Sequence, residues 1–248
     1  WEAGPIAVTD TSEGLAYQAW KLTYSEGAGY NPAMMQYDGI TGYYSSSGLS
    51  ITGNLLTGVI RFKIASFLTA ASPEYNLIVL EDAIGYRRPA LYVYSSDFSN
   101  AERQSKIMLR VQNSAGTNVC LLLSTVTVTD NALHTLFYSY DGDTGVATFV
   151  LDGQDVDDVT FTTRTLTTGT LGTATQLGIG ADPDVVNLTD GQIGYVGLDN
   201  TYLTNWSDFM ENDGTPKELD EVTWTEWGTQ PLFWNDEGEM TVNKGSAS

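Results

Sequence analysis

Apolar and polar residues alternate along many short segments of this chain. The clearest example is the segment 57–64, where apolar Ile60, Phe62 and Ile64 alternate with basic Arg61 and Lys63. Side chains of a strand point to opposite faces in turn, so this spacing predicts a strand with one buried and one wet face. The same alternation recurs in 91–94, 107–111 and 119–123.

The segment 134–153 predicts a complete β-hairpin. An alternating run ends at Tyr140 and meets the turn Asp141–Gly145, and a second run, Val146–Leu151, stops at Asp152. Asp-Gly pairs supply the positive φ angles that tight turns need. Two more short strands are expected at 178–180 and 192–198. Because strands follow one another without helices between them, the order favours antiparallel sheets packed face to face.

The 248 residues are therefore predicted to form an all-β fold, an antiparallel two-sheet β-sandwich with an irregular C-terminal appendage. We place the sandwich at residues 1–205 and the appendage at 206–248, with one short helix at 205–212. The appendage has 10 acidic residues against 2 lysines and holds four of the six tryptophans, Trp206, Trp224, Trp227 and Trp234. Large aromatics mark buried area or an interface, so these four are expected to pack on the sandwich or on a neighbouring subunit.

The charge and the cysteine content narrow the set of partners. The chain has 31 acidic residues against 11 basic ones, a net charge of −20, so a phosphate-rich partner such as nucleic acid would be repelled. No apolar run approaches the roughly 20 residues that cross a bilayer, so membrane insertion is not expected. Cys120, the single cysteine, lies in an apolar run and is predicted to be a buried, inert thiol.

Four segments carry a resemblance to a known family. They are 37–43, 134–142, 145–153 and 191–197, with their Asp-Gly turns at Asp38-Gly39, Asp141-Gly142 and Asp152-Gly153. In order and spacing they resemble the laminin-G-like (LamG) domains of the concanavalin A-like jelly-roll class. The resemblance covers roughly residues 30–203 and implies one large sandwich domain.

The C-terminal segment has a second resemblance. Residues 213–216, 228–233 and 243–245 are similar to tails that follow such domains in structural proteins of tailed bacteriophages. This resemblance implies a virion protein whose partners are other capsid or tail proteins.

Exposed aromatic residues are the candidates for carbohydrate binding, because a tyrosine offers a flat ring and a polar tip together. The candidates are Tyr43, Tyr44, Tyr86, Tyr92 and Tyr94, with Arg87 beside Tyr86 to serve an acidic sugar. The alternative for each tyrosine is packing on a strand face or at a subunit interface.

A calcium ion is the one cofactor that the resemblance admits, because laminin-G-like domains often hold calcium at the sandwich rim. Asp182, Asp184 and Asp190 are the candidate ligands, since calcium takes several hard oxygens from a loop. In a chain with 31 acidic residues, two acids on one loop are also expected by chance.

No catalytic arrangement is found, so we predict that the protein is not an enzyme. Glycoside hydrolases of this fold place two acids on alternate positions of one strand, and the nearest match, Glu218–Val222, puts its last acid on the wrong face. Glu81 and Asp82 are adjacent and would face opposite ways. His134, the only histidine, opens a strand and is expected to be structural.

These observations lead to one main hypothesis and two alternatives. The main hypothesis is a structural or adhesive protein of a tailed-phage virion, a capsid decoration or tail appendage that recognises a host-surface glycan. Virion proteins work in symmetric sets, which favours a homo-oligomer such as a trimer. The alternatives are a secreted or cell-surface lectin-like module, located outside the cell, and a glycoside hydrolase of the same fold.

Overall fold

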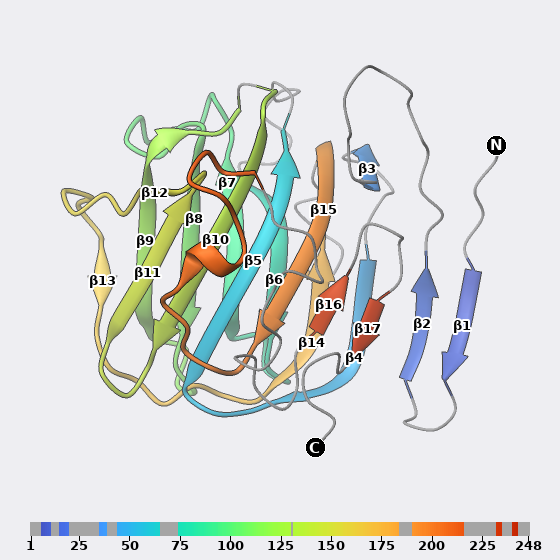
Figure 1. Ribbon diagram of the computed structural model, residues 1–248. Coiled ribbons are helices and arrows are strands. Elements are labelled where there is room, and N and C mark those ends of the chain that lie inside the picture. Colours follow the sequence, from blue (N-terminus) through green and yellow to red (C-terminus); the bar gives the residue numbers. More distant parts are fainter. Residues whose placement is uncertain are drawn as a thin grey trace.

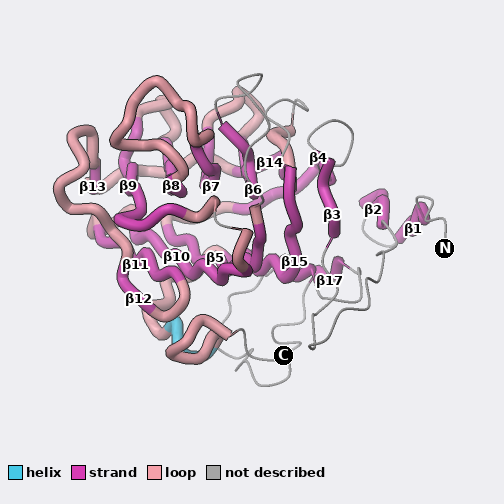
Figure 2. The backbone as a smooth tube through the Cα atoms, turned by 90° about the horizontal axis from the view of Figure 1, so that it is seen from above, coloured by secondary structure: helices cyan, strands magenta, loops and turns pink. Residues whose placement is uncertain are grey.

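The computed structural model describes residues 6–10, 15–19, 35–38, 44–64, 74–129, 131–183, 190–215, 232–234 and 240–242. Over these residues the chain forms two antiparallel sheets that pack face to face, which confirms the predicted all-β sandwich. Figure 1 looks onto the eight-stranded sheet with the seven-stranded sheet behind it, and Figure 2 shows the two layers from above.

The eight-stranded sheet has the order β12-β11-β10-β5-β15-β16-β17, and β3 also pairs with β15. Its strands are β3 (Met35–Asp38), β5 (Leu55–Lys63), β10 (Leu133–Asp141), β11 (Val146–Leu151), β12 (Gln154–Asp155), β15 (Asp190–Asp199), β16 (Leu232–Trp234) and β17 (Met240–Val242).

The seven-stranded sheet has the order β13-β9-β8-β7-β6-β14-β4. Its strands are β4 (Tyr44–Ile51), β6 (Glu74–Glu81), β7 (Arg87–Tyr94), β8 (Lys106–Gln112), β9 (Asn118–Thr127), β13 (Thr165–Leu166) and β14 (Ala174–Ile179). A separate two-stranded sheet joins β1 (Ile6–Asp10) to β2 (Leu15–Ala19). Within the described ranges the only helix is the short 3-10 helix η1 (Trp206–Asp208).

Alternate positions of the strands build the core between the two sheets. In β5 and β8 the predicted inward residues are fully buried: Ile60, Phe62, Ile107, Leu109 and Val111. Arg61 and Lys63, on the other face of β5, are partly exposed. Cys120 lies in the same core, and burial raises the pKa of its thiol far above the ordinary value. The thiolate is therefore disfavoured, as expected for an inert cysteine.

The predicted hairpin is formed by β10 and β11. The two strands pair from Leu136 with Leu151 to Asp141 with Val146. The turn between them ends at Gly145, whose φ of 71° is in the left-handed region that favours glycine. Both strands, the turn and the stop after Leu151 therefore lie where the sequence predicts them.

His134 and Asp152 connect the two ends of this hairpin. Nδ1 of His134 lies 2.7 Å from Oδ2 of Asp152, and Oδ1 of Asp152 accepts a hydrogen bond from the backbone N–H of Thr135 at 2.8 Å. The imidazole is 7% exposed and lies against the ring of Phe62, with 5.6 Å between ring centres. These contacts give His134 a structural role, as predicted.

The C-terminal segment is less irregular than predicted. β16 pairs with residues 196–198 of β15, next to the stretch 190–193 that pairs with β3, and β17 pairs with β16. Since β3 covers only half of this edge of β15, the other half offers unpaired backbone groups that β16 satisfies. The prediction of an irregular appendage is wrong for these six residues.

Residues 203–210 cover the outer face of the eight-stranded sheet. Phe209 and Met210 are buried against residues of β5, β10 and β11, namely Val59, Phe137 and Val150. We call these five residues the appendage cluster. The rings of Phe137 and Phe209 are stacked, 5.3 Å apart at 27°. Figure 2 shows η1 on this outer side of the sheet.

The four candidate interface tryptophans have different outcomes. Trp206 is partly buried against the appendage cluster, so it packs on the sandwich, one of the two predicted placements, and its role at a subunit interface stays a prediction. Trp234 lies in β16, of whose side chains nothing is described, and Trp224 and Trp227 lie outside the described residues. The predicted helix at 205–212 is shorter than expected and spans Trp206–Asp208.

Candidate ligand-binding site

Tyr92 and Tyr94 do not form a carbohydrate-binding surface. They are 3% and 1% exposed, within a cluster on the outer face of the seven-stranded sheet. We call it the tyrosine cluster; its members are Val79, Ala90, Tyr92, Tyr94, Met108, Leu121, Leu123 and Phe161. Because a sugar stacks only on an accessible ring, the prediction for these two tyrosines is wrong.

Two loops cover the tyrosine cluster. Phe161 enters it from the loop 156–164, and Phe98 packs on it from the loop 95–105. The guanidinium of Arg103 lies 5.5 Å from the ring centre of Tyr94 and 5.3 Å from that of Phe161, so it bridges the two elements. Sequence alternation placed both tyrosines on the outer face, but it carries no sign of loops that fold back over them.

A second group of bonds joins these loops at the surface. Glu102 accepts hydrogen bonds from the N–H and the hydroxyl of Thr162, at 2.9 and 2.7 Å. Arg103 donates to Oγ1 of Thr163 at 3.1 Å. We call this set of contacts, together with the Arg103 bridge, the loop latch.

Tyr86 is the candidate aromatic residue that stays accessible. It is half-buried at the end of a tight turn in which Oδ1 of Asp82 accepts hydrogen bonds from the N–H groups of Ile84 and Tyr86, each at 2.9 Å. Its ring lies directly over Gly116, where an added Cβ would be only 2.7 Å from the ring. Glycine at 116 therefore allows the ring to rest on the backbone and fixes its position.

Arg87, next to Tyr86, has its charge already paired. Its Nε lies 3.6 Å from Glu81, and its Nη2 lies 3.8 Å from Asp182. Its backbone N–H donates to Oε1 of Gln112 at 3.0 Å, and Nε2 of Gln112 donates to the carbonyl of Gly116 at 2.8 Å. The same glutamine therefore links the Arg87 strand to the turn under Tyr86.

Arg110 of β8 contacts Asn118, the strand partner of Gln112, and was not among the sequence candidates. Its Nε donates to Oδ1 of Asn118 at 2.9 Å, and its Nη groups have no bonded partner in the part of the chain that the structure describes. It pairs with Ala90 of β7, so a small side chain lies beside it. The alternation in 107–111 sets Arg110 on the face opposite to Leu109 and Val111, but it does not show that Arg110 contacts Asn118.

We call Tyr86, Arg87, Arg110, Gln112 and Asn118 the Tyr86 patch. It combines an aromatic ring that lies over the Gly116 backbone with guanidinium and amide donors. These residues lie where β7 and β9 begin and toward the end of β8. Such a surface can stack on an apolar sugar face and donate hydrogen bonds to its oxygens. Of the remaining candidates, Tyr43 lies outside the described residues, and Tyr44 opens β4 with an undescribed side chain.

Of the three calcium candidates, the structure describes the side chain of Asp182 alone. Asp182 is 5% exposed and faces the guanidinium of Arg87, so a cation placed there would meet a positive charge. Asp184 lies outside the described residues, and Asp190 opens β15 with an undescribed side chain. Among the residues that the structure describes, no group of three His, Cys, Asp or Glu side chains could hold a metal ion.

The acids that could serve catalysis are engaged elsewhere. Asp82 is bonded within its turn, and Glu81 pairs with Arg87. The segment 218–222 lies outside the described residues. Glu81 and Asp82, the adjacent pair of acids considered for catalysis, therefore both have structural partners.

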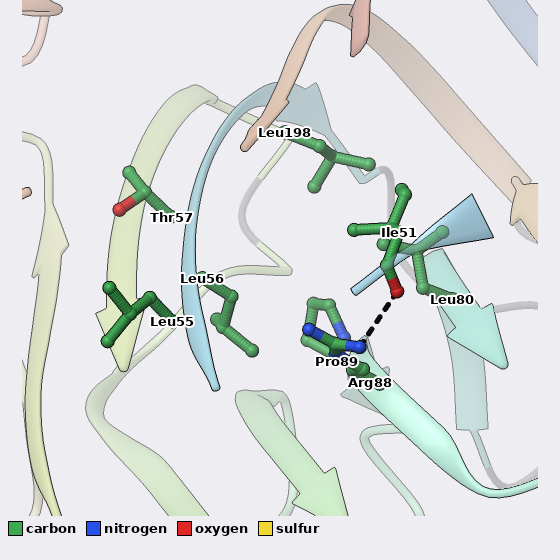
Figure 3. Close-up of a pocket in the computed structure, with 8 residues that line it drawn as sticks. All are labelled: Ile51, Leu55, Leu56, Thr57, Leu80, Arg88, Pro89 and Leu198. Atoms are coloured by element: carbon green, nitrogen blue, oxygen red, sulfur yellow. Dashed lines mark hydrogen bonds between the residues drawn. The ribbon is translucent and has the colours of Figure 1, made fainter. Parts of the chain in front are cut away.

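The one described cavity is too small for a sugar. It lies between β5 and β7 and is lined by Ile51, Leu55, Leu56, Thr57, Leu80, Arg88, Pro89 and Leu198. Figure 3 shows the Arg88 guanidinium donating to the carbonyl of Ile51, at 2.8 Å, and it also donates to the carbonyls of Gly53 and Gly172. The free volume is about 10 Å³, room for about one water. Arg88 therefore fastens loops and does not line a substrate cleft.

The comparisons with known proteins identify the fold. Among solved structures, the chain is similar to the native heptameric SAP-like pentraxin from Limulus polyphemus, with a TM-score of 0.54 and 12% identity, over 86% of this chain and 96% of that one. It is also similar to domains LG4-5 of the mouse laminin alpha1 chain, with a TM-score of 0.49 and 12% identity, over 79% of this chain and 48% of that one.

No protein-family model matches the sequence, and no curated protein matches it either. Within the described residues, no helix is long and apolar enough to cross a membrane. The fold is thus the concanavalin A-like sandwich type shared with pentraxins, as the resemblance in the sequence predicted.

Proposed function

We propose that this protein is a non-enzymatic adhesive and structural protein on the outside of a tailed-phage particle, and that it binds a host-surface glycan through the Tyr86 patch. The observation that carries the glycan-binding role is the partly exposed Tyr86 ring, held over Gly116 in a turn that Gln112 links to Arg87. A ring fixed before binding loses little conformational freedom when a sugar stacks on it. The virion location is supported by the resemblance of residues 213–216, 228–233 and 243–245 to the C-terminal segments that follow such domains in structural proteins of tailed phages.

Glycan binding is tested by screening the full chain on a glycan array and then measuring affinity for the best ligand by calorimetry. Tyr86→Ala is expected to weaken binding at least tenfold, because the stacking surface is lost. Tyr86→Phe is the matched control, since it keeps the ring and should retain most of the affinity. Equal affinity of Tyr86→Ala and the unchanged chain would remove the patch from consideration.

The virion role is tested by mass spectrometry of purified phage particles and by the genes beside this one. We expect the chain in particles, in a fixed ratio to the capsid or tail proteins and as a homo-oligomer such as a trimer. A glycan-binding chain that is absent from particles would be a free secreted lectin. Release of reducing sugar from a polysaccharide panel would contradict the non-enzymatic role.

A further inference from the structure

The outer face of the eight-stranded sheet carries two cations whose side chains have no partner among the described residues. Arg61 and Lys63 are two positions apart on β5, so their side chains leave the same face with Cα atoms about 7 Å apart. Both are partly exposed. Neither makes a hydrogen bond or an ion pair within the part of the chain that the structure describes.

Arg61 is an unusual arginine in so acidic a chain. Its Nε is buried and has no acceptor, although a guanidinium presents five N–H donors. Burial lowers the pKa of Arg61, and the negative charge of Asp152 opposes that shift. A ligand cannot reach the buried Nε, but the Nη groups of Arg61 are not buried and form no hydrogen bond with the residues that the structure describes, so an acceptor supplied from outside would bind them.

The residues that the structure describes do not supply that acceptor. The negative charge of Asp152 acts on Arg61, but both carboxylate oxygens of Asp152 have other partners. Its Oδ2 contacts His134, and its Oδ1 accepts a hydrogen bond from the backbone N–H of Thr135. Other described cations differ in this respect: Arg164 is held by Asp157 at 2.6 Å, and Lys106 by Asp158 at 3.2 Å. The pair Arg61 and Lys63 is therefore a local positive surface on a chain of net charge −20.

We propose that Arg61 and Lys63 form a binding site for the carboxylate or sulfate groups of an acidic polysaccharide. Guanidinium groups bind carboxylate and sulfate oxygens in a bidentate manner, and an ammonium 7 Å or so along the strand adds a second contact. The site lies on the sheet opposite to the Tyr86 patch. This inference rests on the proposed glycan-binding function in one respect: that function is why the anionic ligand is taken to be a polysaccharide.

The test is calorimetry of the full chain with three probes: oligogalacturonate, sulfated dextran oligosaccharide and neutral dextran. We expect the two acidic probes to bind and neutral dextran not to bind at this site. The double variant Arg61→Gln/Lys63→Gln is expected to lose at least tenfold in affinity, and the remaining binding should depend less on salt. Arg61→Lys is expected to lose part of the affinity, because the bidentate contact is lost while the charge remains.

A matched control removes two charges from the side of the seven-stranded sheet, at cations that Asp158 and Asp157 hold. Lys106→Gln/Arg164→Gln has the same net charge as the double variant and should bind the acidic probes like the unchanged chain. Thermal unfolding checks folding, and the Arg61→Gln/Lys63→Gln chain should unfold at an unchanged or higher temperature because an unpaired buried donor is gone.

Three outcomes would overturn the inference. These are equal binding of neutral dextran and acidic probes, equal losses in the double variant and its control, and no binding of either acidic probe. The proposed function fails separately, through Tyr86→Ala on the array ligand, so the two failures are distinguishable.

Discussion

The outer face of the eight-stranded sheet is covered by the segment 201–215, whereas the outer face of the seven-stranded sheet is covered by the loops 95–105 and 156–164. The first cover is mainly apolar and buries Phe209 and Met210 completely. The second depends on polar contacts at the surface, the loop latch. Exposed polar contacts contribute little to stability, so the seven-stranded face should open at a lower free energy.

The largest expected effect is on the apolar cover. Phe209→Ala removes a ring that is 1% exposed and stacked on Phe137, and should lower the free energy of unfolding by about 3–5 kcal/mol. Urea denaturation followed by fluorescence measures it. Ile84→Ala, at a position 74% exposed, is the control and should change stability by less than about 0.5 kcal/mol. Equal losses in the two variants would contradict the importance of this cover.

The next effect concerns the hydrogen bonds that anchor the same cover. The hydroxyl of Thr57, 1% exposed, donates to the carbonyl of Thr201 at 2.8 Å and accepts from the N–H of Leu203 at 3.0 Å. Thr57→Val leaves both backbone groups unpaired and should lower the free energy of unfolding by about 1–3 kcal/mol. Thr57→Ser keeps the hydroxyl and should lose less. Hydrogen exchange should show faster exchange at Leu203 in the valine variant only.

A smaller effect is expected at the loop latch. Arg103→Met keeps the length of the side chain but removes its contacts with Tyr94, Phe161 and Thr163. Stability should fall by about 0.5–2 kcal/mol, and Tyr94 should react faster with a nitrating reagent. Nitration at Tyr94 as slow as in the unchanged chain would show that the loops stay closed without the bridge.

The smallest effect at neutral pH is expected from Tyr92→Phe. Burial raises the pKa of Tyr92 well above 10, so the folded chain holds this proton at a pH where the unfolded chain releases it. Stability from this group is complete below pH 10 and falls as pH rises further, by at most about 1.4 kcal/mol per pH unit. Tyr92→Phe should leave stability nearly unchanged at pH 7 and reduce the alkaline loss, measured by denaturation at pH 8 and 11. Parallel curves for both chains would exclude Tyr92 as the source.

The sequence predicted the sandwich well because alternation is a local signal. The inward residues of β5 alternate within that one strand, and those of β8 do the same. The two strands of the β10–β11 hairpin are joined by a short turn. Spacing within each element is therefore enough to identify it. The role of His134 also followed from its position at a strand start. Such features require no knowledge of what lies across the sheet.

The site was predicted only in part, because it depends on contacts between distant segments. Tyr92 and Phe161 are far apart in the chain, and only the folded loop shows that one covers the other. Likewise, Gly116 comes to Tyr86 from another hairpin, formed by β8 and β9. The pairing of β16 with half of β15 was missed because a three-residue strand has no detectable period.

The position of β5 has a consequence for how fast the chain folds. This central strand, Leu55–Lys63, pairs with Leu133–Asp141 on one side and Asp190–Asp199 on the other. Each partner is separated from it by a long stretch of chain, and closing such loops precedes any gain from pairing. Folding dominated by non-local pairs takes milliseconds to seconds. During synthesis one edge of β5 therefore stays unpaired until β10 has left the ribosome, and the other edge until β15 has left it.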